Sequence, residues 1–364
     1  MKKISVILAA ALMLLIAGSV FGRASAQQTG EVYELALITD LGTIDDKSFN
    51  QGSWEGMVKY ATEKNITYKY YQPSEQSDDA YLSAIDLAVR GGAKLIVTPG
   101  FLFESAIFIA QDRYPNVHFV LVDGEPHSAD YSAFKTNRNV SPLLYAEDQA
   151  GFLAGYAAVK DGNRRLGFMG GMAVPAVIRF GYGFVQGAEY AANELGLAAG
   201  SVTINYHYTG GFNASPEIQT MSASWYNQGA DVIFACGGAV AFSVFAAAEQ
   251  TGKKVIGVDV DQSSESPTVI TSAMKGLQAS VYDCIVDYYN NRFPGGTTKI
   301  FEAANNGVGL PMASSKFTTF RQADYDTIFR ALATGAIPRM MDDPNAGGSP
   351  SVVPVSIVRV TEIR

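Results

Sequence analysis

Short apolar runs alternate along the chain with segments whose apolar residues have helical spacing. From Glu31 onward the apolar runs are VYELALI, ITYKYYQ, KLIVTPG and VHFVLVD. After Val140 a second series begins with RRLGFMGG, SVTINYHY, DVIFACGG and KVIGVDVD. Strands that alternate with helices in this way form βαβ units with parallel sheets. The pattern therefore predicts an α/β fold with two doubly wound lobes.

The segments between these runs predict helices. Their expected ranges are about 49–64, 78–91, 181–194, 216–228 and 239–251. The predicted lobes are residues 28–142, completed by about 272–300, and residues 143–271, completed by about 301–364.

Polar residues or glycines follow the strands of both series. Asp40, Pro99-Gly100 and Asp123 follow strands of the first series; Gly170-Gly171, Gly237-Gly238 and Asp259 follow strands of the second. Ligands of doubly wound sheets bind beyond the carboxyl ends of the strands. We therefore expect these strand ends to face one cleft between the lobes.

The first 26 residues have the pattern of an export signal. A basic MKK start precedes the apolar stretch ISVILAAALMLLIAGSVF and the small-x-small sequence Ala24-Ser25-Ala26. We expect cleavage near Gln27 and a periplasmic or extracytoplasmic protein. Retention of the stretch as an anchor is the alternative. No Cys follows the cleavage pattern, so no lipid attachment is predicted.

Composition narrows the function further. A chain of 364 residues with 48% apolar residues suggests two domains, and a net charge of −8 with a pI near 5.0 argues against nucleic-acid binding. Cys236 and Cys284 lie in apolar contexts and are expected to be buried thiols. His118, His127 and His207 lack ligand spacing, so no metal or cofactor is expected.

The sequence DLGTIDDKSFNQ, residues 40–51, concentrates acids at a strand end. A helix-loop-helix calcium site would need oxygen ligands where Gly42 and Ile44 stand and a Glu where Gln51 stands. The calcium-binding acid pattern of nucleoside hydrolases is also out of register, because Ile38 replaces its first Asp. Phe49 and Asn50 instead offer a stacking face and an amide, which suit a planar heterocycle. The local sequence fits equally well with Phe49 as the first apolar residue of a helix and Asn50 as a solvated turn residue.

The chain resembles the basic membrane protein family of ABC-transporter solute-binding proteins, which includes a spirochaete purine nucleoside receptor. The resemblance rests on TDLGTIDDKSFNQ, AEDQAGFLAGYAA, LGFMGGMAVPAVIRFGYGFVQGAEY, KVIGVDVDQ and ITSAMK, taken in that order. It implies a variant of the type I periplasmic-binding fold, with hinge strands between the lobes. It also implies a small-molecule ligand, a membrane permease as partner and a monomeric protein.

The resemblance implies particular ligand contacts. Phe49 and Phe212 would sandwich a base, and Gly238 would allow a close backbone approach. The implied polar contacts are Asp40, Asn50 and Asp123 around the base and its neighbouring sugar, and Lys275 with Asp259, or alternatively Asp261, at the ribose.

We therefore expect a non-enzymatic protein that binds a purine nucleoside and delivers it to a permease. A binding protein for a sugar or another small polar ligand is the alternative within the same class. A nucleoside hydrolase is the enzymatic alternative, although no catalytic residue cluster has recognisable spacing.

Overall fold

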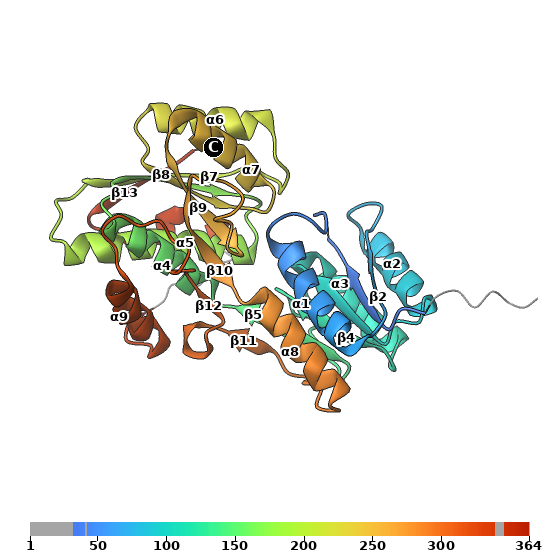
Figure 1. The fold of residues 1–364 in the computed structure, drawn as a ribbon. Helices are drawn as coiled ribbons and strands as arrows, with labels where there is room; N and C mark the ends of the chain where they lie inside the picture. Colours follow the sequence, from blue (N-terminus) through green and yellow to red (C-terminus); the bar gives the residue numbers. More distant parts are fainter. Residues whose placement is uncertain (1–31, 41, 339–345, 364) are drawn as a thin grey trace, which may run out of the picture. The chain divides into compact units, whose positions relative to one another are not determined.

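Two β-sheets form the framework of the computed structural model, which describes residues 32–40, 42–338 and 346–363 (Figure 1). The first sheet has the strand order β11-β5-β4-β3-β1-β2, and the second has the order β12-β10-β9-β8-β6-β7-β13. All strand pairs are parallel except β10 with β12. The predicted α/β fold with two doubly wound sheets is confirmed. The predicted export signal lies outside the described residues.

The strands of the first sheet are β1 (Leu35–Ile38), β2 (Tyr68–Tyr71), β3 (Leu95–Pro99), β4 (His118–Val122), β5 (Val140–Tyr145) and β11 (Lys299–Phe301). Those of the second are β6 (Arg165–Gly170), β7 (Val202–Tyr208), β8 (Val232–Cys236), β9 (Lys254–Asp259), β10 (Val269–Lys275), β12 (Val308–Gly309) and β13 (Val358–Glu362). The helices are α1 (Phe49–Lys64), α2 (Asp78–Arg90), α3 (Glu104–Arg113), α4 (Glu147–Lys160), α5 (Pro175–Glu194), α6 (Pro216–Asn227), α7 (Val240–Thr251), α8 (Leu277–Tyr289) and α9 (Gln322–Ala333). Short 3₁₀ helices are η1 (Phe101–Phe103), η2 (Ala303–Asn305) and η4 (Pro350–Val352).

Each sheet is covered by helices on both faces. Along β1, Leu35 and Leu37 pack in the core that includes α1 and α8, whereas Ala36 and Ile38 pack in the core that includes α2 and α3. In the second sheet, β6 places Phe168 toward α4 and α5, and Met169 toward α6 and α7. Strands buried on both faces explain why the apolar runs are nearly continuous rather than alternating.

Local sequence signals set several helix ends. Ser77 accepts a hydrogen bond from the Ala80 N–H at the start of α2, and Ser215 does the same for Ile218 at the start of α6. Four of the five predicted helices begin within one residue of the expected position. The prediction for α5 was wrong, because this helix begins at Pro175 and not near Gly181. Proline is favoured in the first helical turn, where its missing N–H costs nothing.

The chain passes three times between the two sheets. The crossings follow β5 at Ala146, β10 at Gly276 and β11 at residues 302–307. We call the first sheet with α1, α2, α3 and α8 the first half, and the second sheet with the other α-helices the second half. The apolar cores of the two halves meet, because one buried cluster contains residues of α1 and α8 together with residues of α4 and α5.

Helices α4 and α5 are in backbone contact through four glycines. A side chain at Gly151 or Gly155 of α4 would overlap a carbonyl oxygen of α5, and one at Gly183 or Gly187 of α5 would overlap a carbonyl oxygen of α4. The four-residue spacing puts each pair of glycines on one helix face. This close approach brings the first turn of α4 beside α5.

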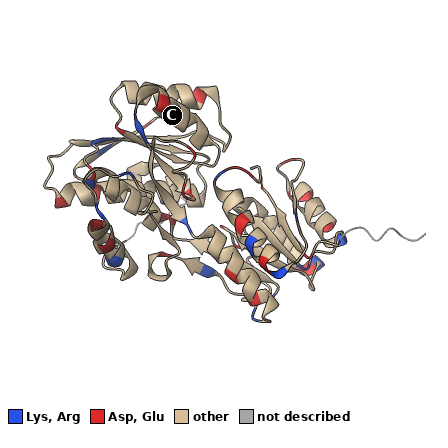
Figure 2. Ribbon diagram, in the orientation of Figure 1, with Lys and Arg blue, Asp and Glu red and all other residues tan. Residues whose placement is uncertain are grey.

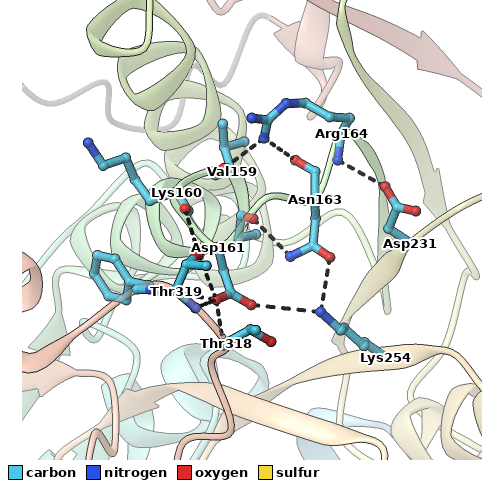
Figure 3. A network of polar contacts seen from close by, with 11 residues as sticks. Val159, Lys160, Asp161, Asn163, Arg164, Asp231, Lys254, Thr318 and Thr319 are labelled. Atoms are coloured by element: carbon cyan, nitrogen blue, oxygen red, sulfur yellow. Dashed lines mark hydrogen bonds and ion pairs between the residues drawn. The ribbon is translucent and has the colours of Figure 1, made fainter.

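The C-terminal part of the chain is tied to the second half by Asp161, which follows α4 (Figure 3). Its carboxylate accepts backbone hydrogen bonds from Thr318, Thr319 and Phe320 at 2.6, 2.6 and 3.2 Å. Lys254 of β9 lies 3.7 Å from the same carboxylate. A buried carboxylate with three N–H donors fixes the path of the segment that leads into α9.

Candidate functional site

A cavity of about 420 Å³ lies where the strand ends of both sheets meet. In the first sheet β2 and β3 lie on opposite sides of β1, and in the second sheet β7 and β8 lie on opposite sides of β6. The order of the strands therefore reverses between β1 and β3 and between β6 and β8. Such reversal points leave a crevice beyond the strand ends. The cavity is lined by five of the six predicted strand-end positions, namely Asp40, Gly100, Asp123, Gly237-Gly238 and Asp259.

The structure brings together eight of the nine residues that the sequence predicted for a ligand site. These are Asp40, Phe49, Asn50, Asp123, Phe212, Gly238, Asp259 and Lys275. Asp261, the alternative to Asp259, is not among the lining residues. Its carboxylate accepts hydrogen bonds from the Ser263 N–H at 3.0 Å and from the Ser314 hydroxyl at 2.5 Å. Asp261 therefore holds a turn, and Asp259 faces the cavity.

Asp123 and Asp259 stand at equivalent positions of the two sheets. Asp123 directly follows β4 and Asp259 ends β9, and both have left-handed backbones with φ of 59° and 66°. Residues other than glycine rarely adopt this conformation, and it costs on the order of 1 kcal/mol or more. Two such residues facing one cavity indicate a functional constraint on both.

Lys275, the last residue of β10, joins these two acids. Its ammonium pairs with Asp123 and lies 3.2 Å from Glu147 and 3.7 Å from Asp259. Burial alone would lower the pKa of Lys275, but the carboxylates of Asp123, Glu147 and Asp259 together raise it, so the side chain stays protonated. Burial raises the pKa of Asp123 and of Asp259, and the Lys275 ammonium partly offsets this effect.

The same ammonium lies in an aromatic environment. It is 4.8 Å from the centroid of the Phe49 ring and 5.4 Å from those of Tyr145 and Phe180. These cation–π contacts stabilise the desolvated charge at the cavity wall. They also connect Phe49 of the first half to Lys275 of the second.

Two residues of the site were not predicted, namely Glu147, which pairs with Lys275, and Arg179, which lines the cavity. The Arg179 Nε donates to Glu147 at 2.7 Å, across the close contact of α4 and α5. Burial acts to raise the pKa of Glu147, but Arg179 and Lys275 together lower it. Both residues lie inside motifs that carried the family resemblance. Nothing in their local spacing distinguishes them from ordinary helix residues.

Asp46 organises the loop that leads into α1. Its buried carboxylate accepts backbone hydrogen bonds from Ser48, Asn50 and Gln51 at 2.9, 3.0 and 3.0 Å. Asp45 is exposed. Asp46 is therefore a buried cap of α1 with several backbone partners.

Asn50 faces the cavity with its donors already used. Its Nδ2 donates to Asp40 at 3.0 Å and to Asp46 at 3.1 Å, and its side chain belongs to a residue that is only 3% exposed. Ionised carboxylates can only accept hydrogen bonds, so the end of the Asn50 amide that faces Asp40 and Asp46 must be the nitrogen. The buried Oδ1 has no hydrogen-bond partner among the described residues. Asn50 therefore has one acceptor and no donor left for a ligand.

Glu104, at the start of α3, forms a further part of the wall that the sequence did not reveal. Its carboxylate accepts from the Glu125 N–H at 2.9 Å, and the Nε2 of His127 lies 3.0 Å from its other oxygen. Burial raises the pKa of Glu104. Glu104 belongs to the run FLFESAIF, whose aromatic residues indicated core packing, and this concealed a polar residue at the cavity.

The second half contributes an apolar wall. The N-cap residue Val174 and the first turns of α5, with Val177 and Phe180, line the cavity, and the loop after β7 supplies Phe212. Gly171 lets the Phe212 ring approach, because a Cβ there would overlap this ring. The cavity thus combines aromatic and aliphatic surface with acceptor groups, as small-molecule sites do.

Two observations concern what the described residues lack. Residues 32–40, 42–338 and 346–363 contain no group of three or more His, Cys, Asp or Glu side chains placed to hold a metal ion. Within the same part of the chain, no helix is both long enough and apolar enough to cross a membrane. Cys236 and Cys284 are buried free thiols, as predicted.

Two parallel-sheet halves with a cavity between their strand ends define a type I periplasmic-binding-protein-like solute-binding fold. Solved structures of this fold agree: an ABC transporter solute-binding protein from Aeropyrum pernix K1 matches with a TM-score of 0.75 and 22% identity, covering 86% of this chain and 95% of its own. A second one, from Conexibacter woesei, matches with a TM-score of 0.67 and 21% identity over 85% of this chain and 100% of its own.

Residues 33–332 match the family described as ABC transporter substrate-binding protein PnrA-like, and the chain belongs to this family. The ABC transporter nucleoside-binding protein BmpA of Lactococcus lactis subsp. cremoris is 31% identical over 306 residues, which are 77% of this chain and 82% of that protein. Basic membrane protein B of Borreliella burgdorferi is 28% identical over 304 residues, 81% and 86% of the two chains. The predicted family membership is confirmed.

Proposed function

We propose that the protein binds a purine nucleoside in the cavity between its halves and delivers it to the permease of an ABC-type importer, without catalysing a reaction. One observation carries this proposal. Aromatic residues from both halves, Phe49 and Phe212, line the same cavity as a ring of acceptor groups around Lys275. The relative from Lactococcus lactis, named a nucleoside-binding protein, supports the same ligand class.

The two ends of such a ligand need different partners. A planar base stacks on aromatic rings, a contact worth about 1–3 kcal/mol per base. Ribose hydroxyls donate to carboxylates and accept from an ammonium, which Asp123, Asp259 and Lys275 provide together. Charge-assisted hydrogen bonds in a closed cavity penalise ligands without the matching hydroxyls.

Two polar residues of the cavity lining favour particular bases. Asn50 offers only its Oδ1, and Glu104 offers only carboxylate oxygens. A base edge that meets these acceptors must carry N–H donors. We therefore propose that guanosine and inosine, which have an N1–H, bind more tightly than adenosine, whose N1 is an acceptor.

We also propose that each half moves as a lobe and closes on the ligand. The crossings at Ala146, Gly276 and residues 302–307 are the expected hinge positions. The lobes predicted from sequence, with boundaries near residues 142, 271 and 300, remain part of this proposal, as do a monomeric state and an exported chain with a cleaved N-terminal signal.

Calorimetry of protein stripped of bound ligand tests the proposal. Guanosine and inosine should bind, adenosine should bind more weakly, and ribose alone should not compete. Binding of ribose as tight as that of guanosine would instead indicate a sugar-binding protein. Recovery of the nucleoside intact after long incubation is expected, and release of free base would show a hydrolase.

A further inference from the structure

Gln262 lies outside the cavity lining, at the end of the sequence DVDQ between β9 and β10. The side chain is buried, with 1% of the residue exposed. Its Oε1 accepts a hydrogen bond from the Val258 N–H at 2.9 Å, and the backbone N–H of Gln262 donates to the Ser272 hydroxyl at 3.1 Å. These contacts fix Gln262 to the second half.

The free end of this side chain reaches the first half. The Nε2 of Gln262 donates to the backbone carbonyl of Lys47 at 2.9 Å. Lys47 has a left-handed backbone with φ of 54°, which few residues other than glycine adopt. The Gln262 amide, fixed in the second half, therefore binds the carbonyl of Lys47, whose backbone in the first half is strained.

A second hydrogen bond joins the halves one residue further on. The Ser48 hydroxyl donates to the Asp259 Oδ2 at 2.6 Å. The absence of a side chain at Gly52 lets Val260 approach α1, because a Cβ there would lie 3.0 Å from a Val260 methyl group. We call Lys47, Ser48, Asp259 and Gln262 the clasp.

The clasp holds the loop that carries the proposed base-binding residues. Lys47 and Ser48 immediately precede Phe49 and Asn50, the first residues of α1. The bonds of the clasp exist only while the two halves are together, so they add to the stability of the closed arrangement and not to ligand contacts. A bound state held by such bonds loses ligand faster when they are removed.

We propose that Gln262 is a positioning residue that couples closure of the halves to retention of the ligand; this inference rests on the proposed function. Gln262 touches no cavity surface, so its loss acts through the Lys47 carbonyl and the loop before α1. It should raise the dissociation rate and should not lower the association rate, because capture occurs in the open form and loss of the clasp increases the share of this form in the ligand-free protein.

The variant Gln262→Glu tests this with little change of shape. One carboxylate oxygen can still accept from Val258, whereas the other turns an acceptor toward the Lys47 carbonyl. Gln228→Glu is the matched control, because Gln228 follows α6, is exposed and donates only to Ser224 of the same helix. Ser48→Ala is a milder second variant that removes the other bond of the clasp.

Stopped-flow measurements with guanosine should show a dissociation rate about tenfold higher for Gln262→Glu, as expected for the loss of one buried hydrogen bond, with an association rate no lower than that of the wild type. Gln228→Glu should match the wild type, and Ser48→Ala should fall between. Small-angle scattering of ligand-free protein should show a larger radius of gyration for Gln262→Glu.

An unchanged dissociation rate in both clasp variants overturns the inference, and so does a lower melting temperature with unchanged kinetics. Scattering without ligand separates this failure from that of the proposed function. If the wild type binds no nucleoside, the proposed function fails, while an expanded Gln262→Glu variant would still show that the clasp holds the halves together.

Discussion

Asp123 and Asp259 occupy matching places in the two halves, yet their surroundings differ. Both follow a buried parallel strand, both have a left-handed backbone, and both contact Lys275. One oxygen of Asp259, Oδ2, accepts a hydrogen bond from the Ser48 hydroxyl of the opposite half. The Oδ1 of Asp123 has no hydrogen-bond partner within the described part of the chain.

The difference shows how one motif can serve two purposes. The second half uses its strand-end acid partly to hold the first half, whereas the proposed function assigns the corresponding acid of the first half to the ligand. Since Lys275 neutralises both acids, the two purposes depend on a single cation. The following changes test that division, from the largest expected effect to the smallest.

Replacing the shared cation should have the largest effect. Lys275→Met leaves Asp123, Glu147 and Asp259 without this partner, and the free energy of unfolding should fall by about 3–5 kcal/mol. Urea unfolding measures this loss. Lys299→Met is the control, because Lys299 makes a partly exposed pair with Asp287 that is worth about 0–1 kcal/mol.

The loss in Lys275→Met should depend on pH. Without the ammonium, burial raises the folded-state pKa of Asp123 and Asp259 further above the unfolded value of about 3.9. The folded state then binds more protons than the unfolded state, so the free energy of unfolding decreases as pH rises. A deficit that is larger at acidic than at neutral pH would contradict this account.

Neutralising each acid separately should distinguish the two halves. Asp123→Asn should weaken guanosine binding by about 1.5–3 kcal/mol, because it removes a charged acceptor proposed to contact the ligand. Asp259→Asn should cost less, since the amide oxygen can still accept from Ser48. Calorimetry on both variants measures the difference, and equal losses would refute the division of purpose.

The two aromatic residues should contribute similarly despite lying in different halves. Phe49→Ala and Phe212→Ala should each weaken guanosine binding by about 1–3 kcal/mol, through loss of base stacking. Phe134→Ala is the control, because Phe134 is 66% exposed and does not line the cavity. Titration calorimetry measures the guanosine affinity of each variant. If only one of the two variants loses affinity, the base stacks on only one aromatic ring.

The smallest effects should separate the neighbouring acids of the loop that carries Ser48. Asp46→Ala removes the cap of α1 and should lower the free energy of unfolding by about 1–2 kcal/mol. Asp45→Ala should change it by less than about 0.5 kcal/mol, because Asp45 is exposed. Thermal unfolding compares them, and EDTA should leave ligand affinity unchanged. A large loss of ligand affinity in EDTA would instead indicate that this loop binds a metal ion.

The sequence predicted the fold well because the central strands of both sheets, β1, β3, β4, β6, β8 and β9, are buried on both faces. Apolar runs such as LIVT and VIFAC then stand out from the helices between them. The ends of parallel strands meet at one edge, which explains why the predicted strand-end residues Asp40, Asp123, Gly238 and Asp259 line the cavity. The other site residues were implied by the family resemblance. The start of α5 was missed although Pro175, at the first helical position, is itself a helix-start signal.

The unpredicted part of the site depends on contacts between distant segments. Glu147 and Arg179 are 32 residues apart and meet only because α4 and α5 pack closely. Glu104 is held by His127, which has no recognisable spacing to it in the sequence. The choice between Asp259 and Asp261 also needed coordinates, because DVD places both acids near the end of the same strand. Figure 2 shows acidic and basic residues scattered over both halves, so charge alone does not mark the site.

The glycines between α4 and α5 have a consequence for how this protein tolerates mutation. They do not line the cavity, yet their lack of side chains lets α4 and α5 approach closely enough for Glu147 to bind Arg179. Glu147 in turn helps to position the Lys275 ammonium. A search for specificity determinants among charged and aromatic residues would pass over them. Laboratory evolution toward a new ligand should therefore accept changes on the apolar wall of the cavity far more readily than a single added carbon at this helix crossing.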